Sequence, residues 1–514
     1  MYLGDHAARH PERQAVVLGD RALSYAELDE TSNQLAHALA ALGLGPGDVV
    51  AVMLPNSLAW APVWWGVFRS GMYLTTINWH LTPAEISYIL GNSGARVLVT
   101  SEQTAEVAAA AAHEHRGVVR LQTGGASAPG VLSYEDLVAD QPRSTIAREL
   151  AGGPMFYSSG TTGRPKGVRS PLPGRHPSDV STTSQVLCSA FGIGDGDRYL
   201  CPAPLYHSGP ASFSFGCQAV GATAVIMSRF DAQESLRLIQ DQKVTVSQWV
   251  PTMFQRLLRL PDEVKSAYDL STHRLALHAA APCPPWAKRA MIEWWGPILV
   301  EYYGSTEVGA TVITSEEWLQ RPGSVGKLWG LDTPIAIIDP ATSRPVPAGE
   351  QGLVYFEPMP SNRFAYHRDP DKTARAYLGP LATAGDIGYL DDDGYLYLTD
   401  RLSNMIISGG VNIYPQEIEH RLGEHPAVFD VAVFGVPDDE FGEQVKGVVQ
   451  LAPGWNPSEE LARELVTFCR ATLASFKLPA SVDFETELPR DDNGKLYKRR
   501  LRDRYWAGRP SRLV

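Results

Sequence analysis

The sequence predicts an α/β fold: a large N-terminal domain of mainly parallel βα sheets plus a small β region, followed by a small α+β C-terminal domain. Three observations lead to this prediction. Strand and helix patterns alternate through the first half of the chain, as they do in parallel sheets. Short β-like runs bounded by Gly, Pro and Asp begin near residue 320, and a separate α+β pattern follows residues 400–403.

The N-terminal elements follow from hydrophobic spacing and from capping residues. Residues 25–42 carry apolar side chains at helical spacing, and Ser24 with Glu27 forms a capping box at the start of this helix. The apolar run 49–54 is closed by Pro55-Asn56-Ser57, which is typical of a buried strand and its turn. Further strands are expected at 95–100, 222–227 and 244–250, and further helices from Thr82 onward and at 234–242.

The later part of the chain divides in two. Residues 335–338, 352–356, 388–390 and 395–398 predict a small antiparallel β region, and residues 170–178 predict an exposed loop. The C-terminal segment predicts a helix at 415–422, strands at 428–436 and 445–451, and a helix at 458–473. We therefore expect domains at 1–402 and 403–514.

Composition narrows the class of protein. The chain has 514 residues, 44% hydrophobic and 20% charged, as in globular proteins, and its net charge of −12 argues against nucleic-acid binding. Its five cysteines form no CxxC pair, which favours a reducing compartment over a disulfide scaffold or a zinc site. No signal peptide or apolar run of membrane-spanning length is evident, so we expect a cytoplasmic protein without a membrane span.

The strongest motif is Tyr157-Ser-Ser-Gly-Thr-Thr-Gly-Arg-Pro-Lys-Gly167. Glycines let backbone N–H groups turn toward an anion, and hydroxyls and an ammonium add donors and charge, so the segment predicts a triphosphate site. The common P-loop differs, because it needs Ser or Thr directly after the lysine. The alternative is a surface turn. The candidate ligands are Ser158, Ser159, Gly160, Thr161, Thr162 and Lys166.

This segment resembles the signature loop of the adenylate-forming enzymes, the superfamily of acyl-CoA synthetases, luciferases and peptide-synthetase adenylation domains. Other segments, in the order of that superfamily, resemble its further motifs: Tyr302-Tyr-Gly-Ser-Thr-Glu307, Ala384-Gly-Asp386, Asp400-Arg401, Ile406–Glu419 and Asn493-Gly-Lys495. Ala384 stands where threonine is usual. Residues 77–83 and 278–284 bring the resemblance closest to bacterial fatty-acyl-CoA synthetases.

The resemblance implies a set of nucleotide-binding residues. The signature loop would hold the β- and γ-phosphates of ATP, Thr306 would contact the α-phosphate, and Glu307 would bind Mg²⁺, which prefers oxygen ligands. Asp386 would accept hydrogen bonds from the ribose, and Arg401 would approach ribose and phosphates. The adenine would lie among Ala280, Ala281, Pro282, Tyr302, Tyr303 and Gly304.

The same resemblance implies a mobile C-terminal domain. Lys495 would be the catalytic cation that bridges the substrate carboxylate and the α-phosphate. Ser403 would be the hinge, where many relatives carry Asp or Lys, and Gly409 and Gly410 would line a tunnel for the thiol of CoA. The alternatives are a solvated lysine in a basic tail and an ordinary glycine turn.

His207 is the candidate for a gate to the acid pocket, and Trp249 and Val250 are candidates for its wall. The sequence leaves three functions open. One is an acyl-CoA synthetase that uses ATP, Mg²⁺ and CoA on a hydrophobic acid, and another is an amide synthetase that passes the acyl-adenylate to an amine. The third is a non-catalytic binding protein. The identity of the acid and the oligomeric state also stay open.

Overall fold

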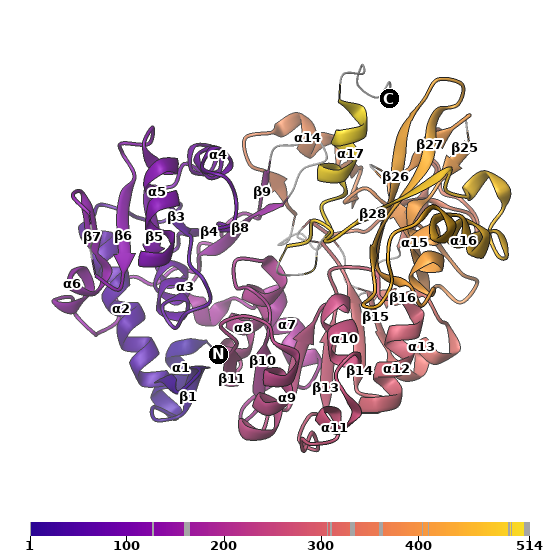
Figure 1. Ribbon diagram of the computed structural model, residues 1–514. Helices are drawn as coiled ribbons and strands as arrows, with labels where there is room; N and C mark the ends of the chain where they lie inside the picture. The colour runs from indigo at the N-terminus through magenta and orange to yellow at the C-terminus, as the bar shows by residue number, and fades with distance from the viewer. Residues whose placement is uncertain are drawn as a thin grey trace.

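The computed structural model describes residues 2–125, 128–158, 165–305, 307–308, 311–328, 335–358, 363–402, 404–409, 411–491, 494 and 496–507. Two large sheets build the N-terminal domain, and a smaller sheet builds a second lobe from the C-terminal part of the chain (Figure 1). None of the described helices is both long enough and apolar enough to cross a membrane. The α/β prediction with a large and a small domain is confirmed.

The first sheet joins the middle of the chain to the predicted small β region. Its strand order is β17 (Ala336–Ile338), β18 (Gly352–Tyr355), β22 (Asp386–Leu390), β23 (Leu396–Arg401), β16 (Ser324–Leu328), β15 (Thr311–Thr314), β14 (Leu299–Tyr303), β13 (Leu275–His278), β12 (Val246–Trp249), β10 (Arg198–Cys201), β11 (Thr223–Ile226), β1 (Gln14–Leu18) and β2 (Arg21–Ser24). Strands from β14 to β1 run parallel, and those from β15 to β17 pair antiparallel. The antiparallel region is therefore not a separate unit, because β15 and β16 continue the hydrogen bonding of β14.

The second sheet carries the signature motif at its edge. Its order is β19 (Ala365–Tyr366), β9 (Lys166–Arg169), β8 (Gly153–Ser158), β4 (Tyr73–Thr76), β3 (Val49–Val52), β5 (Val97–Ser101), β6 (Val119–Thr123) and β7 (Val131–Ser133). Strands β8 to β7 are parallel, whereas β8, β9 and β19 pair antiparallel. A two-stranded ribbon of β20 (Tyr377–Leu378) and β21 (Leu381–Ala382) lies apart.

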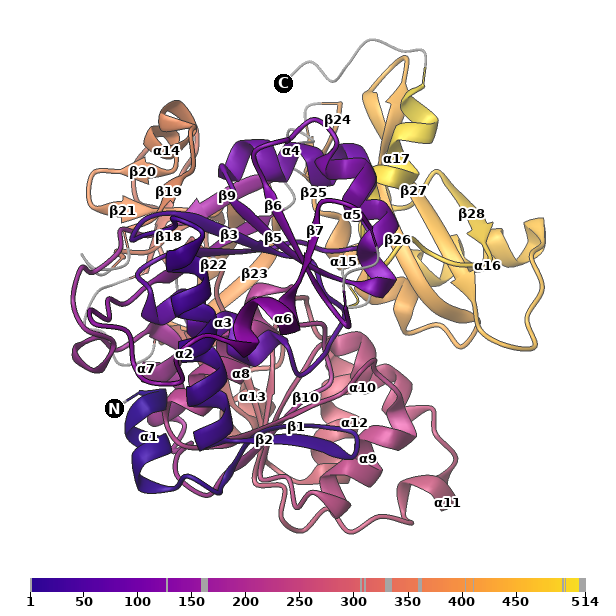
Figure 2. The same ribbon diagram turned by 90° about the vertical axis from the view of Figure 1, so that its left-hand side faces the viewer.

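Helices fill the space between the sheets and cover their outer faces (Figures 1 and 2). They are α1 (Leu3–Arg9), α2 (Tyr25–Ala41), α3 (Trp60–Arg69), α4 (Pro83–Ser93), α5 (Ala105–Ala112), α6 (Tyr134–Ala139), α7 (Thr183–Ala190), α8 (Ser208–Ala219), α9 (Ala232–Asp241), α10 (Pro251–Leu258), α11 (Asp262–Lys265), α12 (Pro285–Trp295), α13 (Ser315–Gln320) and α14 (Pro370–Arg375). The Ser24 hydroxyl accepts from the Glu27 amide at 3.2 Å, and the Glu27 carboxylate accepts from the Ser24 amide at 2.7 Å, so the predicted capping box is confirmed.

The C-terminal lobe has cores of its own. Its sheet runs β25 (Val411–Ile413), β24 (Ile406–Ser408), β27 (Gly442–Leu451) and β26 (Val428–Asp438), with β28 (Ser481–Glu485) beside β27. Helices α15 (Pro415–Gly423), α16 (Glu459–Arg470) and α17 (Lys498–Trp506) accompany it. The buried apolar clusters of residues 406–501 include no member from the N-terminal domain, which fits a lobe that folds around its own apolar side chains.

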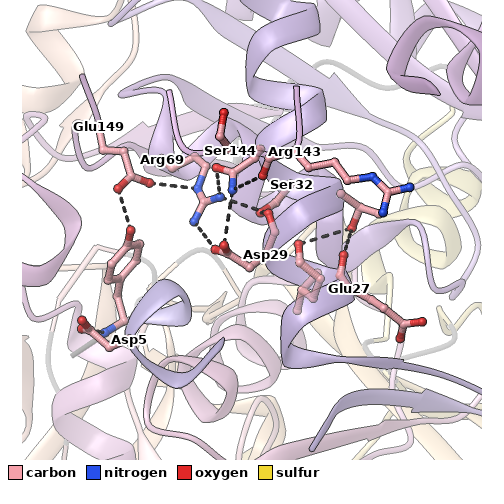
Figure 3. Close-up of polar contacts among 12 residues, drawn as sticks. Asp5, Glu27, Asp29, Ser32, Arg69, Arg143, Ser144 and Glu149 are labelled. Atoms are coloured by element: carbon pink, nitrogen blue, oxygen red, sulfur yellow. Dashed lines mark hydrogen bonds and ion pairs between the residues drawn. The ribbon is translucent and has the colours of Figure 1, made fainter. Parts of the chain in front are cut away.

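A buried ionic network joins the N-terminal helices (Figure 3). Arg69 at the end of α3 is 1% exposed; its Nε lies 3.0 Å from Glu149 Oε1 and its Nη2 lies 2.6 Å from Asp29 Oδ1. The Tyr2 hydroxyl donates to Glu149 Oε2 at 2.6 Å, and burial raises the pKa of Tyr2 above its usual value. The network ties α1, α2 and α3 together through Arg69 and Glu149, which have almost no access to water, and through the half-buried Asp29.

Arg69→Met should therefore destabilise the N-terminal domain by about 3–5 kcal/mol, because it removes the buried cation that pairs with the buried Glu149 and the half-buried Asp29. Urea unfolding followed by tryptophan fluorescence measures this. Arg143→Met is the matched control: Arg143 pairs with Glu30 at 3.0 Å, but its side chain is 71% exposed, and such pairs contribute only about 0–1 kcal/mol. Equal losses in the two variants would contradict the importance assigned to the network.

Candidate functional site

The site lies where parallel strands of both sheets end. The segments after β10, β12, β13 and β14 and the turn between β8 and β9 leave their sheets at carboxyl ends, which is where ligands bind in open α/β sheets. A cavity of about 2160 Å³ opens there, and residues of the C-terminal lobe form part of its wall. The sequence motifs therefore converge on one space between the two domains.

Lys166 begins β9 and lines this cavity. Its ammonium lies 4.9 Å from the centre of the Tyr366 ring on β19. Burial lowers the pKa of Lys166 to about 8, and the neighbouring ammonium of Lys372 adds to the effect. The backbone of Ser158 ends β8, paired with Lys166, but Ser159, Gly160, Thr161 and Thr162 lie outside the described residues.

Glu307 lies beside the same tyrosine. The Tyr366 hydroxyl donates to Glu307 Oε1 at 3.2 Å, which directs the carboxylate toward the Lys166 side of the cavity. In the described part of the chain no group of three or more His, Cys, Asp and Glu side chains forms a ready metal site. A single carboxylate fits Mg²⁺ nonetheless, since this ion is usually held by one or two carboxylates together with substrate phosphates. Thr306 lies outside the described residues.

Asp386 forms the centre of a hydrogen-bonded cluster. Its Oδ2 accepts from the Tyr303 hydroxyl at 2.6 Å, and its Oδ1 accepts from Arg401 Nε at 3.0 Å. Asp386 and Arg401 face each other across β22 and β23, so the sheet register itself sets this pair. The Asp386 carboxylate raises the pKa of Arg401, while burial together with that carboxylate raises the pKa of Tyr303. The cluster holds a fixed carboxylate at the cavity wall, with lone pairs left for a ligand's hydroxyl groups.

The backbone after β13 is strained next to this cluster. Ala280 has φ of +77°, a left-handed conformation that side-chain-bearing residues rarely adopt. Ala280, Ala281 and Pro282 all line the cavity, as does Gly304 after β14. Such strain gathers at ligand sites, where the surrounding fold holds the backbone in place.

Tyr302 and Tyr303 point to opposite faces of β14, as successive residues of a strand must. Tyr303 joins Asp386, whereas the Tyr302 hydroxyl accepts from Gln248 Nε2 and its ring packs 5.4 Å from that of Phe213 on α8. Of the two adjacent tyrosines, only Tyr303 therefore contacts the Asp386 cluster. Tyr302 instead belongs to an inner part of the cavity between β14 and α8.

Aromatic side chains line this inner part. They are Trp64, Trp65 and Phe68 on α3 and Phe213 and Phe215 on α8, and the rings of Trp64 and Phe215 stack at 4.3 Å. Trp249 and Val250 line the cavity too, although the Trp249 indole is buried against Trp295 at 5.3 Å and donates to Ser247 Oγ. The inner cavity is thus suited to an apolar group.

His207 occupies the N-cap position of α8, without a capping hydrogen bond from its side chain, and lines the cavity. Its Nε2 lies 3.7 Å from Oδ2 of Asp491, which belongs to the turn that precedes α17. The ring packs on Tyr206 with 4.5 Å between centres. The predicted gate residue thus contacts the C-terminal lobe directly.

The turn 490–497 of the C-terminal lobe reaches into the site. Arg490 holds it by pairing with Asp430 at 2.5 Å and by donating to the Gly494 carbonyl at 2.5 Å. Gly494 has φ of +74°, and a Cβ there would lie 2.1 Å from Oγ1 of Thr252 at the start of α10. Only glycine fits so close to α10. Lys495 lies outside the described residues, between Gly494 and Leu496.

A second contact fixes the lobe on α10. Arg259, which follows this helix, stacks its guanidinium 3.7 Å from the centre of the Phe429 ring and donates to the Phe429 carbonyl at 3.2 Å. Arg259 belongs to the N-terminal domain and Phe429 to the C-terminal lobe. The structure therefore shows the C-terminal lobe closed over the cavity.

Asp400 spans the predicted hinge. Its carboxylate accepts from the Asn404 side chain at 2.9 Å and from the Gln416 amide at 3.2 Å, on the far side of Ser403. Ser403 and Gly410 lie outside the described residues. Gly409 has φ of +56° and donates its amide to the Phe441 carbonyl at 2.8 Å, away from the closed cavity.

Several residues of the site carry no motif signal. Gln248 and Tyr366 lie in ordinary strand segments, and Lys372 lies in a short polar helix, so only the fold brings them to the cavity region. Thr252 lines the cavity in the same segment as Trp249 and Val250, and only its contact with Gly494 has no signal in the sequence. Asp491 had one available signal, its position four residues before Lys495.

Comparison with known proteins supports this geometry. The family model of the AMP-binding enzyme matches residues 3–358, and that of the AMP-binding enzyme C-terminal domain matches residues 417–495. The fatty acid–[acyl-carrier-protein] ligase ScoC of Streptomyces coeruleorubidus is 34% identical, over 98% of this chain and 95% of its own. The long-chain-fatty-acid–CoA ligase FadD13 of Mycobacterium tuberculosis is 32% identical, over 99% of this chain and 98% of its own.

A solved structure shares the whole architecture. The amide bond synthetase McbA of Marinactinospora thermotolerans superposes with a TM-score of 0.82 at 26% identity, over 98% of this chain and 99% of its own. These relatives use three kinds of acyl acceptor according to their names. The chain belongs to the AMP-binding enzyme family, the adenylate-forming superfamily that includes the acyl-CoA synthetases.

Proposed function

We propose that this protein is an acid–thiol ligase that activates a hydrophobic carboxylic acid with ATP and transfers the acyl group to CoA. The observation that carries the proposal is the close approach of Gly494 to Thr252 of α10, beside an aromatic-lined cavity. Lys166, Glu307 and Arg401 lie on the other side of that cavity. The residues proposed to bind the nucleotide and the aromatic pocket proposed to bind the acid thus line one cavity, in which a carboxylate and a phosphate could react.

In the first step an oxygen of the acid's carboxylate attacks the α-phosphorus of ATP, the bond to the bridging oxygen breaks, and pyrophosphate leaves. The protein's task is to hold these groups in line and to stabilise negative charge on the phosphate oxygens. Lys166 and the signature-loop residues Ser158, Ser159, Gly160, Thr161 and Thr162 would bind the β- and γ-phosphates. Asp386 would accept from the ribose hydroxyls, with Tyr303 and Arg401 fixing its orientation.

Adenine would lie against the strained Ala280–Pro282 backbone, near Tyr303 and Gly304. Thr306 would contact the α-phosphate, and Lys495 would bridge it to the carboxylate. Glu307 would hold Mg²⁺, which when bound neutralises part of the phosphate charge. Each of these roles rests on the motif positions together with the location of the described neighbours.

We propose that the acid is apolar because aromatic side chains line the inner part of the cavity. Trp64, Phe213 and Phe215 enclose the inner cavity, and burial of an apolar chain there is favourable by about 25 cal/mol per Å². ScoC and FadD13 are both named for fatty acids, which supports the same class. His207 would separate this pocket from the nucleotide, and Trp249 and Val250 would form part of its wall.

In the second step the sulfur of CoA attacks the acyl carbon, AMP leaves, and the thiol proton passes to solvent. The closed turn fills the side from which a thiol would approach, so we propose that the domain 403–514 rotates on 1–402 about Ser403. Rotation would release the Asp491 contact of His207 and bring Gly409 and Gly410 to the thiol path. An amine as acceptor is the second candidate, favoured by the architecture shared with McbA.

Turnover by the purified protein tests the proposal. With a panel of fatty and aromatic acids, ATP and Mg²⁺, we expect pyrophosphate release that depends on the acid, and steady AMP and thioester formation only when CoA is added. Amide formation with amines and no thioester with CoA would replace the first candidate by the second. No acid-dependent pyrophosphate release with any acid would refute both.

Gly494→Ala should lower acid-dependent ATP–pyrophosphate exchange at least tenfold, because its Cβ would overlap Thr252 Oγ1 and displace the turn. Gly454→Ala is the matched control. Gly454 has a similar left-handed φ of +89° in the same lobe, but a Cβ there would meet nothing within 4 Å. Adding Thr252→Ala to Gly494→Ala should restore part of the exchange. Equal exchange in the two single variants would show that close docking of the turn is unnecessary.

A further inference from the structure

Two lysine ammoniums share one aromatic ring in the site. Lys166 Nζ lies 4.9 Å and Lys372 Nζ 5.6 Å from the centre of the Tyr366 ring. Neither forms an ion pair with a carboxylate among the described residues, although half-buried lysines elsewhere in the chain do. The Glu307 carboxylate offsets part of the repulsion at Lys166, but two like charges held close together stay unfavourable, and a bound polyanion would reverse this.

The fold fixes Lys372 in this position. Strand β19 pairs with β9, so that Tyr366 lies opposite Val168 and the His367 amide donates to the Gly167 carbonyl at 2.7 Å. Helix α14 begins three residues later, where the Asp369 carboxylate accepts from the Lys372 amide at 3.0 Å. The pairing of β19 with β9 and the Asp369 cap therefore fix the backbone of Lys372 relative to the β8–β9 hairpin.

The charged groups follow one another in an order that matches a nucleotide. Asp386 and Arg401 form one end, and the Glu307 carboxylate follows, bonded to the Tyr366 hydroxyl. Lys166 and Lys372 lie together near the ring of the same tyrosine. With ribose at Asp386, the terminal phosphates extend toward the two lysines. Lys166 belongs to the signature motif, whereas Lys372 comes from a separate helix without a motif.

We propose that Lys372 is a second cation for the β- and γ-phosphates of ATP, and for pyrophosphate before its release, acting beside Lys166. The proposal rests on the proposed function, since it assumes that a triphosphate occupies the site. It assigns Lys372 to the adenylation step alone, because AMP and the acyl-adenylate lack the phosphates that it would contact. An ammonium suits this position as a compact charge with three donors.

Equilibrium binding separates this role from a structural one. We expect Lys372→Met to weaken binding of Mg·ATP and of Mg·pyrophosphate about tenfold, the loss of one charge-assisted hydrogen bond, while the affinity for AMP changes less than twofold. Lys372→Arg should retain most of the ATP affinity. Arg375→Met is the matched control: it removes a cation from the exposed end of the same helix and should change none of the three affinities.

Equal ATP affinity in wild type and Lys372→Met would overturn the proposal. An equal loss for ATP and AMP would also overturn it, because it would show that the lysine only maintains the fold of the site. Failure of the proposed ATP-dependent activation has a different signature, because the wild-type protein itself would then bind neither ATP nor AMP. An amine in place of CoA as acceptor would leave all three affinities unchanged.

Discussion

The close approach of Gly494 to Thr252 is the contact on which the closed arrangement depends. A Cβ atom on Gly494 would lie 2.1 Å from Oγ1 of Thr252 in the other domain. Only glycine fits there, and it also tolerates the left-handed backbone of this position. The Arg490–Asp430 pair shapes the turn within its own lobe, and Arg259 against Phe429 anchors that lobe to α10. One helix of the large domain therefore receives both the turn and the lobe.

Electrostatics divides the cavity into two parts. The chain as a whole carries a net charge of −12, yet Lys166, Lys372 and Arg401 gather on the nucleotide side. Burial lowers the pKa of Lys166 to about 8, so its ammonium form is less stable than that of an exposed lysine until an anion binds. The inner part is lined by aromatic side chains and suits an apolar group. The charge of the whole chain argues against nucleic acid as a partner but says nothing of such a local site.

Much of the fold could be predicted from the sequence because the local signals are strong. The capping box at Ser24, the alternation of apolar runs and the Pro-Asn-Ser turn after β3 mark elements within a few residues of their observed ends. The joining of the antiparallel strands to the first sheet could not be predicted, because it depends on β16 pairing with β23, a strand that is distant in sequence. Hydrophobic spacing reports which face of a strand is buried, not which strand lies beside it.

The site shows the same division. Motif positions predicted Lys166, Glu307, Asp386 and Arg401, and the fold brings these together at one edge. Lys372 and Gln248 reach the same region through strand pairing, and Thr252 meets Gly494 through domain closure, and neither kind of contact leaves a local pattern. The adjacent tyrosines separate because strand geometry sends Tyr302 toward Gln248 and Tyr303 toward Asp386.

The central claim is that one cavity performs two steps and that the turn carrying Lys495 serves only the first. The most direct measurement compares the two half-reactions of Lys495→Ala in single-turnover experiments. The account predicts a loss of acyl-adenylate formation from acid and ATP by at least a hundredfold, while thioester formation from supplied acyl-adenylate and CoA stays within a few-fold of wild type. Equal losses in both half-reactions would contradict it.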